Sequence, residues 1–229
     1  MTAAFDRGDI DALIEDAAEQ LEVIRSLYDA TLHEREASRR LKTRIKNVLE
    51  NQRSALEYIA HAIVERHGDP KRHSYYPVAP TPSKFPDAFK RTLPDVKSAK
   101  IRKAIETRQP YQAGYEWLAD LVTLTNENKH RRLSPQTRRE QRRIRAETSG
   151  TLVEWSPSNV RFGPGVRIGG VPVNPATQRP VSSPTQTITE IVYVDWLFQE
   201  PAASALGTLT RIQDSLPALI DEVLAAAGL

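Results

Sequence analysis

The sequence predicts a mainly α-helical protein, a helical bundle with a small antiparallel β-meander inserted before a C-terminal helix. Between Gly8 and Gly68 there is neither glycine nor proline, so this long stretch is free to be helical. Residues 151–198 are instead rich in β-branched and aromatic residues and contain Gly-Pro-Gly and Gly-Gly turns. We therefore expect a single domain, with a helical core at 1–133, a basic loop and β insertion at 134–199 and a final helix at 200–229.

The first stretch predicts two amphipathic helices. Apolar residues recur every three or four positions from Ile10 to Leu27 and again from Leu41 to Ile63. The intervening "HEREASRR" is almost wholly polar, so the chain either turns there or continues as one solvated helix. We favour a hairpin, because a single helix rising about 1.5 Å per residue would leave much of its apolar stripe without a partner.

The next segment, 69–97, contains six prolines, which exclude a long helix. Its aromatic residues indicate a loop that is fixed to the core and is not a free linker. A short helix is expected at 97–107, followed by a helix at 112–131. The aromatic residues of the loop are Tyr75, Tyr76, Phe85 and Phe89, and the inward residues of the second helix are Trp117, Leu118, Leu121 and Leu124.

The β insertion is predicted from three segments, "TLVEW", "NVRFGPGVRIGGVPV" and "TQTITEIVYVDWLF". Pro201 then opens a last helix whose apolar residues run from Leu206 to Val223. We expect this helix to pack back onto the bundle, since its stripe needs a partner and a short sheet offers little area.

The composition predicts a cytoplasmic protein without a membrane segment, a cofactor or a metal site. There is no cysteine, so disulfides and thiolate ligands are excluded. The N-terminus is acidic and lacks the features of a signal peptide, and no apolar run approaches the ~20 residues that cross a bilayer. The five histidines have no metal-ligand spacing on one helix.

Positive charge is concentrated in "RRLSPQTRREQRRIR", residues 131–145. This segment carries seven arginines and one glutamate, a local +6, whereas the whole chain carries +3 and the remainder therefore −3. Such a segment favours phosphate-rich or acidic partners. The alternative is a solvated loop that only improves solubility. Its candidate phosphate-binding residues are Arg131, Arg132, Arg138, Arg139, Arg142 and Arg143.

Directly before it, the helix that contains "LADLVTLTNENKH" ends in polar residues. Asn126 and His130 are four residues apart and share a helical face. Lys129, Arg131 and Arg132 are adequately explained as cations that offset the negative end of the helix dipole. Asn126 and His130 are explained less well in this way.

A second polar line is formed by Arg53, Glu57 and His61, which are also spaced by four. It is either an intrahelical ladder of ion pairs or part of a site, in which Glu57 orients an imidazole and Arg53 binds phosphate.

Four blocks, "RSALEYIA" (53–60), "YYPVA" (75–79), "QPY" (109–111) and "NENKHRRL" (126–133), resemble a family of uncharacterised bacterial proteins. Members of that family carry an Arg-Ser-Ala-Leu-Asp helix, a Phe-Pro-Ile loop, a Gln-Pro-Tyr and an Asn-x-Asp-Lys-His-Arg end in the same order. The resemblance covers roughly residues 47–133. It implies a grouping and no particular activity.

The segment "TNENKH" (125–130) is also similar to the motif of the HEPN superfamily, helical domains that include dimeric, metal-independent ribonucleases of toxin and antiphage systems. That motif has Arg, often followed by Asn, and then His. Asn126 and His130 match it, whereas Thr125 stands where the Arg should be. The resemblance implies that His130 is the acid/base and that Asn126 orients it, with Lys129 beside them. Either Arg53 or Arg131 replaces the missing Arg, or the site is inactive and only binds.

We therefore expect a protein that binds RNA, more than DNA, or another phosphate-bearing ligand, as a homodimer and as a candidate endoribonuclease of bacterial defence. Its catalytic residues would be His130, Asn126 and Glu57. The alternatives are a non-catalytic interaction protein that binds a second copy or an acidic partner, and a DNA-binding regulator, although no helix-turn-helix with a basic second helix is present.

Overall fold

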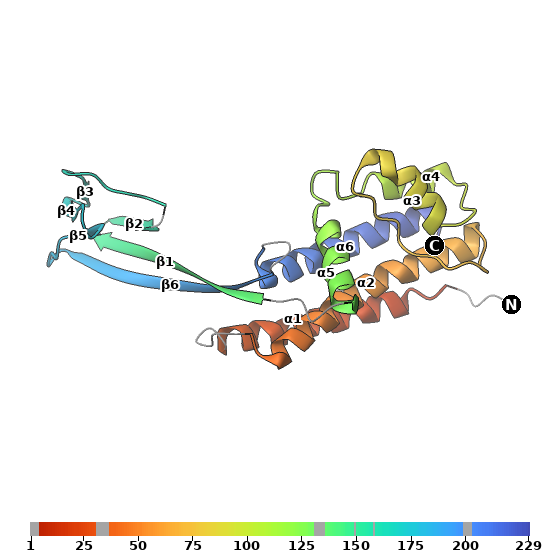
Figure 1. Ribbon diagram of the computed structural model, residues 1–229, viewed down its shortest axis with the longest axis horizontal. Coiled ribbons are helices and arrows are strands. Elements are labelled where there is room, and N and C mark those ends of the chain that lie inside the picture. Colours follow the sequence, from red (N-terminus) through yellow and green to blue (C-terminus); the bar gives the residue numbers. More distant parts are fainter. Residues whose placement is uncertain (1–4, 31–36, 131–135, 149, 158, 199–202) are drawn as a thin grey trace. The chain divides into compact units, whose positions relative to one another are not determined.

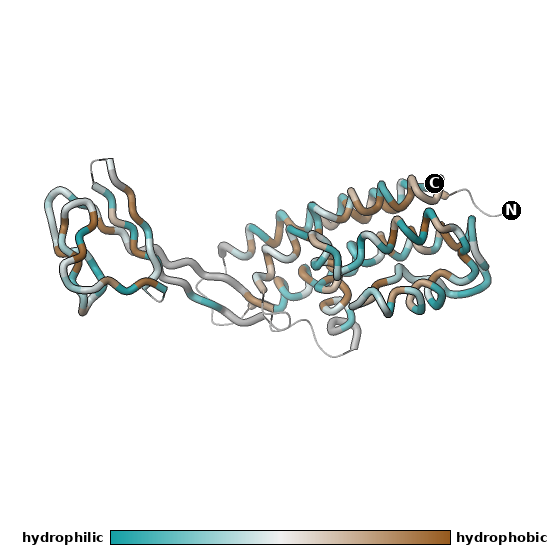
Figure 2. The backbone as a smooth tube through the Cα atoms, turned by 90° about the horizontal axis from the view of Figure 1, so that it is seen from above, coloured by the Kyte–Doolittle hydropathy of each residue, from teal (hydrophilic) through white to brown (hydrophobic). Residues whose placement is uncertain are grey.

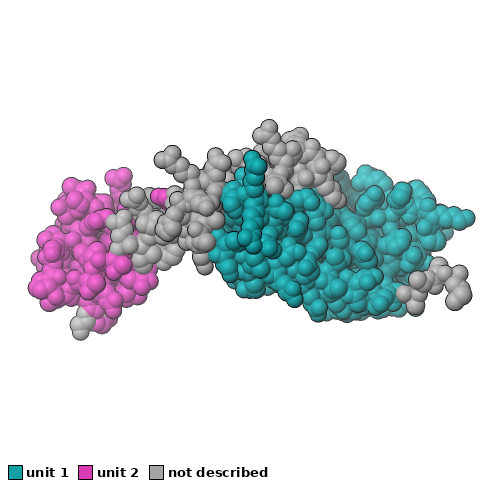
Figure 3. All heavy atoms as spheres, turned by 90° about the horizontal axis from the view of Figure 1, so that it is seen from below, with its two compact units in different colours: residues 1–137, 196–229 teal, residues 138–195 magenta. Residues whose placement is uncertain are grey.

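The computed structural model describes residues 5–30, 37–130, 136–148, 150–157, 159–198 and 203–229. The chain forms two compact units, coloured separately in Figure 3. Unit 1 comprises Met1–Thr137 and Trp196–Leu229, and unit 2 comprises Arg138–Asp195. Each unit has a hydrophobic core of its own, so each is described by itself. The predicted mainly α fold is confirmed.

Unit 1 is built on a helical hairpin of α1 (Gly8–Ala30) and α2 (Arg39–His67), which pack along each other (Figure 1). The hairpin expected from the sequence is therefore confirmed. Ser38 caps α2, its Oγ accepting from the backbone N of Leu41 at 3.2 Å. The apolar stripes of both helices enter one core, in which Ile10, Ile24 and Leu41 are fully buried.

Short helices follow the hairpin: η1 (Pro82–Lys84), α3 (Phe85–Thr92) and α4 (Ala99–Glu106). Tyr76, Phe85 and Phe89 fix this proline-rich region to the core as expected. Tyr75 does not, because it is 55% exposed. Helix α5 (Trp117–His130) begins later than predicted, since residues 111–116 form turns in which Gly114 adopts a φ of 88°.

The last helix, α6 (Ala205–Ala227), closes unit 1. It contacts α1, α2, α4 and α5, which confirms that the C-terminal helix packs back on the bundle. Hydrophobic residues run along it in Figure 2. Two polar bonds fix its position: Gln213 Nε2 donates to the Ile14 carbonyl at 3.0 Å, and Gln52 Nε2 donates to Gln213 Oε1 at 3.0 Å. None of the described helices is long and apolar enough to cross a lipid bilayer.

Unit 2 contains two antiparallel three-stranded sheets. The larger sheet has the order β2-β1-β6 and is formed by β1 (Gln136–Thr148), β2 (Thr151–Trp155) and β6 (Gln186–Phe198), of which β1 and β6 extend at one end into unit 1. The smaller has the order β3-β4-β5, from β3 (Arg167–Ile168), β4 (Val171–Asn174) and β5 (Arg179–Pro180). The core of this unit consists of Ile144, Ala146, Trp155, Ile168 and Val173.

One expectation for this region is wrong. The arginine-rich segment was expected to be a loop, yet Gln136–Thr148 forms the central strand of the larger sheet. Ile144 and Ala146 supply its buried side, and residues 144–148 pair with β2 while β6 is the neighbour on the other edge. Only two of the thirteen residues are apolar, which is too few for an alternating apolar pattern to predict a strand. The strand nevertheless has one buried face, as a strand in a sheet requires.

Candidate functional site

Arg53 and Glu57 on α2 form an ion pair, as their spacing predicts. Glu57 also reaches across to the next segment, where its Oε2 accepts from the backbone N of Tyr76 at 2.7 Å. His61 is 60% exposed and lies 3.4 Å from Glu65 and from Ser74 Oγ. The three residues thus have different surroundings: Glu57, paired with Arg53, holds the 75–79 segment at Tyr76, and His61 faces solvent.

Gln109 holds the same segment from its other side. It is fully buried, its Oε1 accepts from the Ala79 N at 2.8 Å, and its Nε2 donates to the carbonyls of Pro77 at 2.9 Å and Ile105 at 3.2 Å. Three of the four blocks behind the family resemblance, 53–60, 75–79 and 109–111, are therefore joined by hydrogen bonds. A structural role accounts for this joining without a ligand.

The hydroxyl of Tyr76, a residue of the same segment, is buried. Burial raises its pKa, while Arg108 and Arg53 nearby act in the opposite direction and Tyr115 in the same direction. The hydroxyl therefore stays protonated at neutral pH. It has no hydrogen-bond partner among the described residues, and the same holds for Arg53 Nη1 and Arg108 Nε.

The end of α5 carries the residues similar to the ribonuclease motif. Thr125 is 1% exposed, and its hydroxyl donates to the Leu121 carbonyl at 2.7 Å, so it cannot contact a substrate. Asn126 is exposed and makes no hydrogen bond with the described side chains. The side chains of Lys129 and His130, like Arg131 and Arg132, lie outside the described residues. Of the expected catalytic residues, only Glu57 is thus placed in a bonded network.

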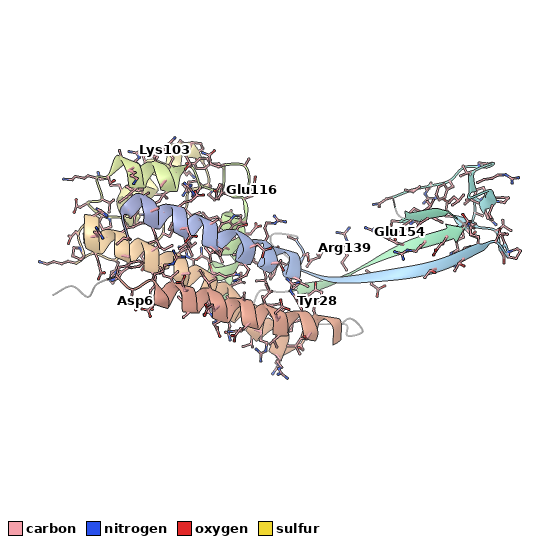
Figure 4. All side chains as sticks on the ribbon, turned by 180° about the vertical axis from the view of Figure 1, so that it is seen from behind. Asp6, Tyr28, Lys103, Glu116, Arg139 and Glu154 are labelled. Atoms are coloured by element: carbon pink, nitrogen blue, oxygen red, sulfur yellow. The ribbon has the colours of Figure 1, made fainter. Side chains whose placement is uncertain are left out.

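The second group of candidate residues lies on β1. Its register pairs Arg145 with Glu154 and Ile144 with Trp155 on β2. Because side chains alternate along a strand, Ile144 and Ala146 enter the core while Arg143 and Arg145 point outward. Arg139 has the same parity and is exposed. We call the outward side of β1 with Arg139, Arg143 and Arg145 the arginine face; Arg139 and Glu154 are labelled in Figure 4.

Glu154 orders two of these arginines. Its carboxylate accepts from Arg143 Nη1 at 3.0 Å and from Arg145 Nη2 at 3.1 Å. Hydrogen bonds from Arg143 and then Arg145 hold the pKa of Glu154 below its ordinary value. A guanidinium has five N–H donors, and Arg145 uses its Nε and Nη2 for this carboxylate. Arg139 forms no ion pair with the described residues.

The positive charge of the whole chain is concentrated in unit 2. Residues 138–195 contain eight arginines, no lysine and five carboxylates, a net charge of +3, so the rest of the chain is neutral overall. Arg138 and Arg142 were also expected to bind phosphate, and their side chains lie outside the described residues. The sequence missed the part played by Glu154, since its pairing with Arg143 and Arg145 depends on strand register.

Within the described parts of the chain, no group of three histidines or carboxylates lies close enough together to hold a metal ion. Comparisons with protein-family models, with curated proteins and with solved structures find no match to this chain.

Proposed function

We propose that unit 2 binds the phosphate backbone of RNA through the arginine face. One observation carries this proposal: Arg143 and Arg145 alternate along β1 with Ile144 and Ala146 of the unit 2 core, so the fold holds these two arginines outward, and Arg139 is exposed at the same parity of the strand. The strand pairing fixes the spacing of these cations. A fixed spacing reduces the entropy that is lost on binding.

The chemistry of the arginine face indicates phosphate contacts and not base reading. Guanidinium groups bind phosphate oxygens through paired hydrogen bonds. The face has no aromatic side chain among its described residues, and stacking of bases needs one. Binding should therefore depend little on sequence and strongly on salt. The similarity of 125–130 to ribonucleases is the reason for naming RNA before DNA.

Cleavage is not part of this proposal. A ribonuclease of the expected kind needs a cation at the scissile phosphate, and Thr125 at the motif position is buried and bonded to its own helix. Glu57 already accepts from Tyr76 N and pairs with Arg53. We expect RNA to be bound and to remain intact.

The test is a salt titration of the affinity for a labelled single-stranded RNA, measured by fluorescence anisotropy. Three phosphate contacts give a slope of log K against log salt of about −2, and each neutralised arginine should lower the magnitude by about 0.7. The double variant Arg139→Gln/Arg143→Gln should therefore bind weakly and with a slope of about −0.7.

Arg161→Gln is the matched control, because Arg161 is an exposed arginine of the same unit away from β1. It should change the affinity much less than the double variant. Equal losses in both variants would mean that only net charge matters, which contradicts a site on the arginine face. A duplex DNA of the same length, bound more tightly than RNA, would reject RNA as the ligand, and a gel of the incubated RNA shows whether it is cleaved.

A further inference from the structure

Unit 1 is neutral as a whole, but residues 66–103 within it carry a large excess of positive charge. They contain six lysines and four arginines against three aspartates, a net charge of +7. All ten cationic side chains are exposed. None of them forms an ion pair with a residue that the structure describes. This charge is therefore available to a partner.

The segments that carry these cations are joined to one another. The chain that follows α2 runs beside the end of α3, because the backbone N of Asp69 donates to the Pro94 carbonyl and that of Tyr75 to the Thr92 carbonyl, each at 3.1 Å. Helices α3 and α4 lie next to each other in Figure 1. We call the exposed side of residues 66–103 the basic surface.

Helix α4 shows how the fold holds such cations outward. Ile101 and Ile105 are fully buried, which fixes one side of the helix against the core. Ser98 caps it, its Oγ accepting from the Ile101 N at 3.3 Å. Arg102 and Lys103 lie on the exposed side, and Lys103 is labelled in Figure 4. The backbone positions of these two cations are thus set by packing.

Helix α1 carries the opposite charge. Residues 5–30 contain eight carboxylates and two arginines, a net charge of −6. Both arginines, Arg7 and Arg25, already form ion pairs within unit 1. Glu15 and Glu19 are exposed and form no ion pair with a described residue. Negative charge on this helix thus remains uncompensated.

The carboxylates of α1 follow its solvent side. Glu15 and Glu19 are one turn apart, on the side opposite the buried Ala17, Leu21 and Ile24. We call the exposed side of α1 the acidic face.

The two charged regions cannot meet within one molecule. In Figures 1 and 4, α1 lies on one side of α2 and α6, and α3 and α4 lie on the other side. A second copy brings its own acidic face, whose charge of −6 nearly balances the +7 of the basic surface. A contact between two different surfaces of identical copies is heterologous, so it leaves one free surface of each kind and can extend.

We infer that the basic surface of one copy binds the acidic face of a second copy, so that the protein associates head to tail. Exposed ion pairs contribute little individually and are screened by salt. The association is therefore weak, depends on protein concentration and is strongest at low salt. This inference does not rest on RNA binding by unit 2, so either can fail alone.

The test is sedimentation velocity of the full chain after nuclease treatment, at ionic strengths of about 0.01 M and about 0.15 M, between which the Debye length falls from about 30 Å to about 8 Å. The wild type should form species larger than the monomer at the lower salt and dissociate at the higher. Arg102→Gln/Lys103→Gln and Glu15→Gln/Glu19→Gln should each raise the Kd of association about tenfold.

A mixture of the two variants is the decisive sample. Each variant associates weakly alone but keeps the surface that the other has lost, so the mixture should form a heterodimer that does not extend. A mixture that remains monomeric overturns the inference, and so does a wild type that is monomeric at the lower salt.

Arg161→Gln/Arg167→Gln is the matched control, because it removes two exposed arginines of unit 2 and changes the net charge as much as Arg102→Gln/Lys103→Gln does. It should associate like the wild type. An equal loss in this control would mean that only net charge matters, which contradicts a contact through the basic surface. Circular dichroism checks that each variant remains helical.

Discussion

Gln109 shows how one buried amide holds a loop that has no regular structure. It is bonded to Ala79, Pro77 and Ile105, and Glu57 holds the neighbouring Tyr76 N. Backbone groups in a buried loop must find partners, and a side-chain amide supplies both a donor and an acceptor. Hydrogen bonds within the fold therefore account for the glutamine of "QPY" and for the position of the "YYPVA" segment.

Replacing Gln109 by leucine should lower the free energy of unfolding by about 2–4 kcal/mol, because it leaves the Ala79 N–H and the Pro77 carbonyl buried without partners. Urea denaturation followed by circular dichroism measures this. Gln112→Leu is the control: its side chain is partly exposed and makes no hydrogen bond with the described residues, so the change should be within about 0.5 kcal/mol. Equal effects would refute the role given to Gln109.

At the scale of elements, strand β1 is held by its register with β2 and by the pairing of Glu154 with two arginines. Because the pKa of Glu154 is lowered in the folded state, its contribution to stability is present above the ordinary value of 4.5 and is lost as the pH falls through the lower, folded-state pKa. Loss of this one contribution should therefore lower the stability of unit 2 only in acid.

The effect of replacing Glu154 on the stability of unit 2 should differ between neutral and acidic pH. Glu154→Gln should destabilise unit 2 at neutral pH and have a smaller effect at a pH well below 4.5, where the carboxyl of the wild type is protonated. The denaturant midpoint, followed by the fluorescence of the buried Trp155 in a variant without other tryptophans, measures it. An effect that is the same at both pH values would contradict the pairing.

The elements also show what the sequence could and could not predict. The helices with long apolar stripes, α1, α2 and α6, follow from the 3.6-residue period, since burial of one face alone specifies them. β1 does not, because only Ile144 and Ala146 mark its buried side among many arginines. The arginines of the site were recognised by their charge, while the face on which they lie depends on register.

At the scale of the whole molecule, two cores belong to two units. The chain leaves and re-enters unit 1 at Thr137 and Trp196, on strands that are neighbours in one sheet. The insertion therefore does not separate the parts of the helical core. Whether the chain behaves as the single domain expected from the sequence depends on whether the two units fold cooperatively.

Replacing residues 138–195 by a short Gly-Ser linker should leave unit 1 folded, because its core contains no residue of that range. The shortened chain should keep its helical circular dichroism and a cooperative unfolding transition, and it should lose RNA binding. A shortened chain that is unfolded would show that unit 1 needs unit 2.

The direction in which the RNA affinity changes when Glu154 is replaced tests the arginine face. Glu154 competes with phosphate for Arg143 and Arg145, and glutamine retains the shape of the side chain without the charge. Removing this carboxylate should therefore tighten RNA binding, whereas loss of an arginine weakens it.

The measurement is fluorescence anisotropy of labelled RNA with wild type, Glu154→Gln and Arg139→Gln, at low and at physiological salt. Glu154→Gln should bind RNA more tightly, with a salt slope steeper by about 0.7, and Arg139→Gln should bind more weakly, with a slope shallower by about the same amount. Unchanged or weaker binding by Glu154→Gln, in a protein that remains folded, would contradict an RNA site on the arginine face.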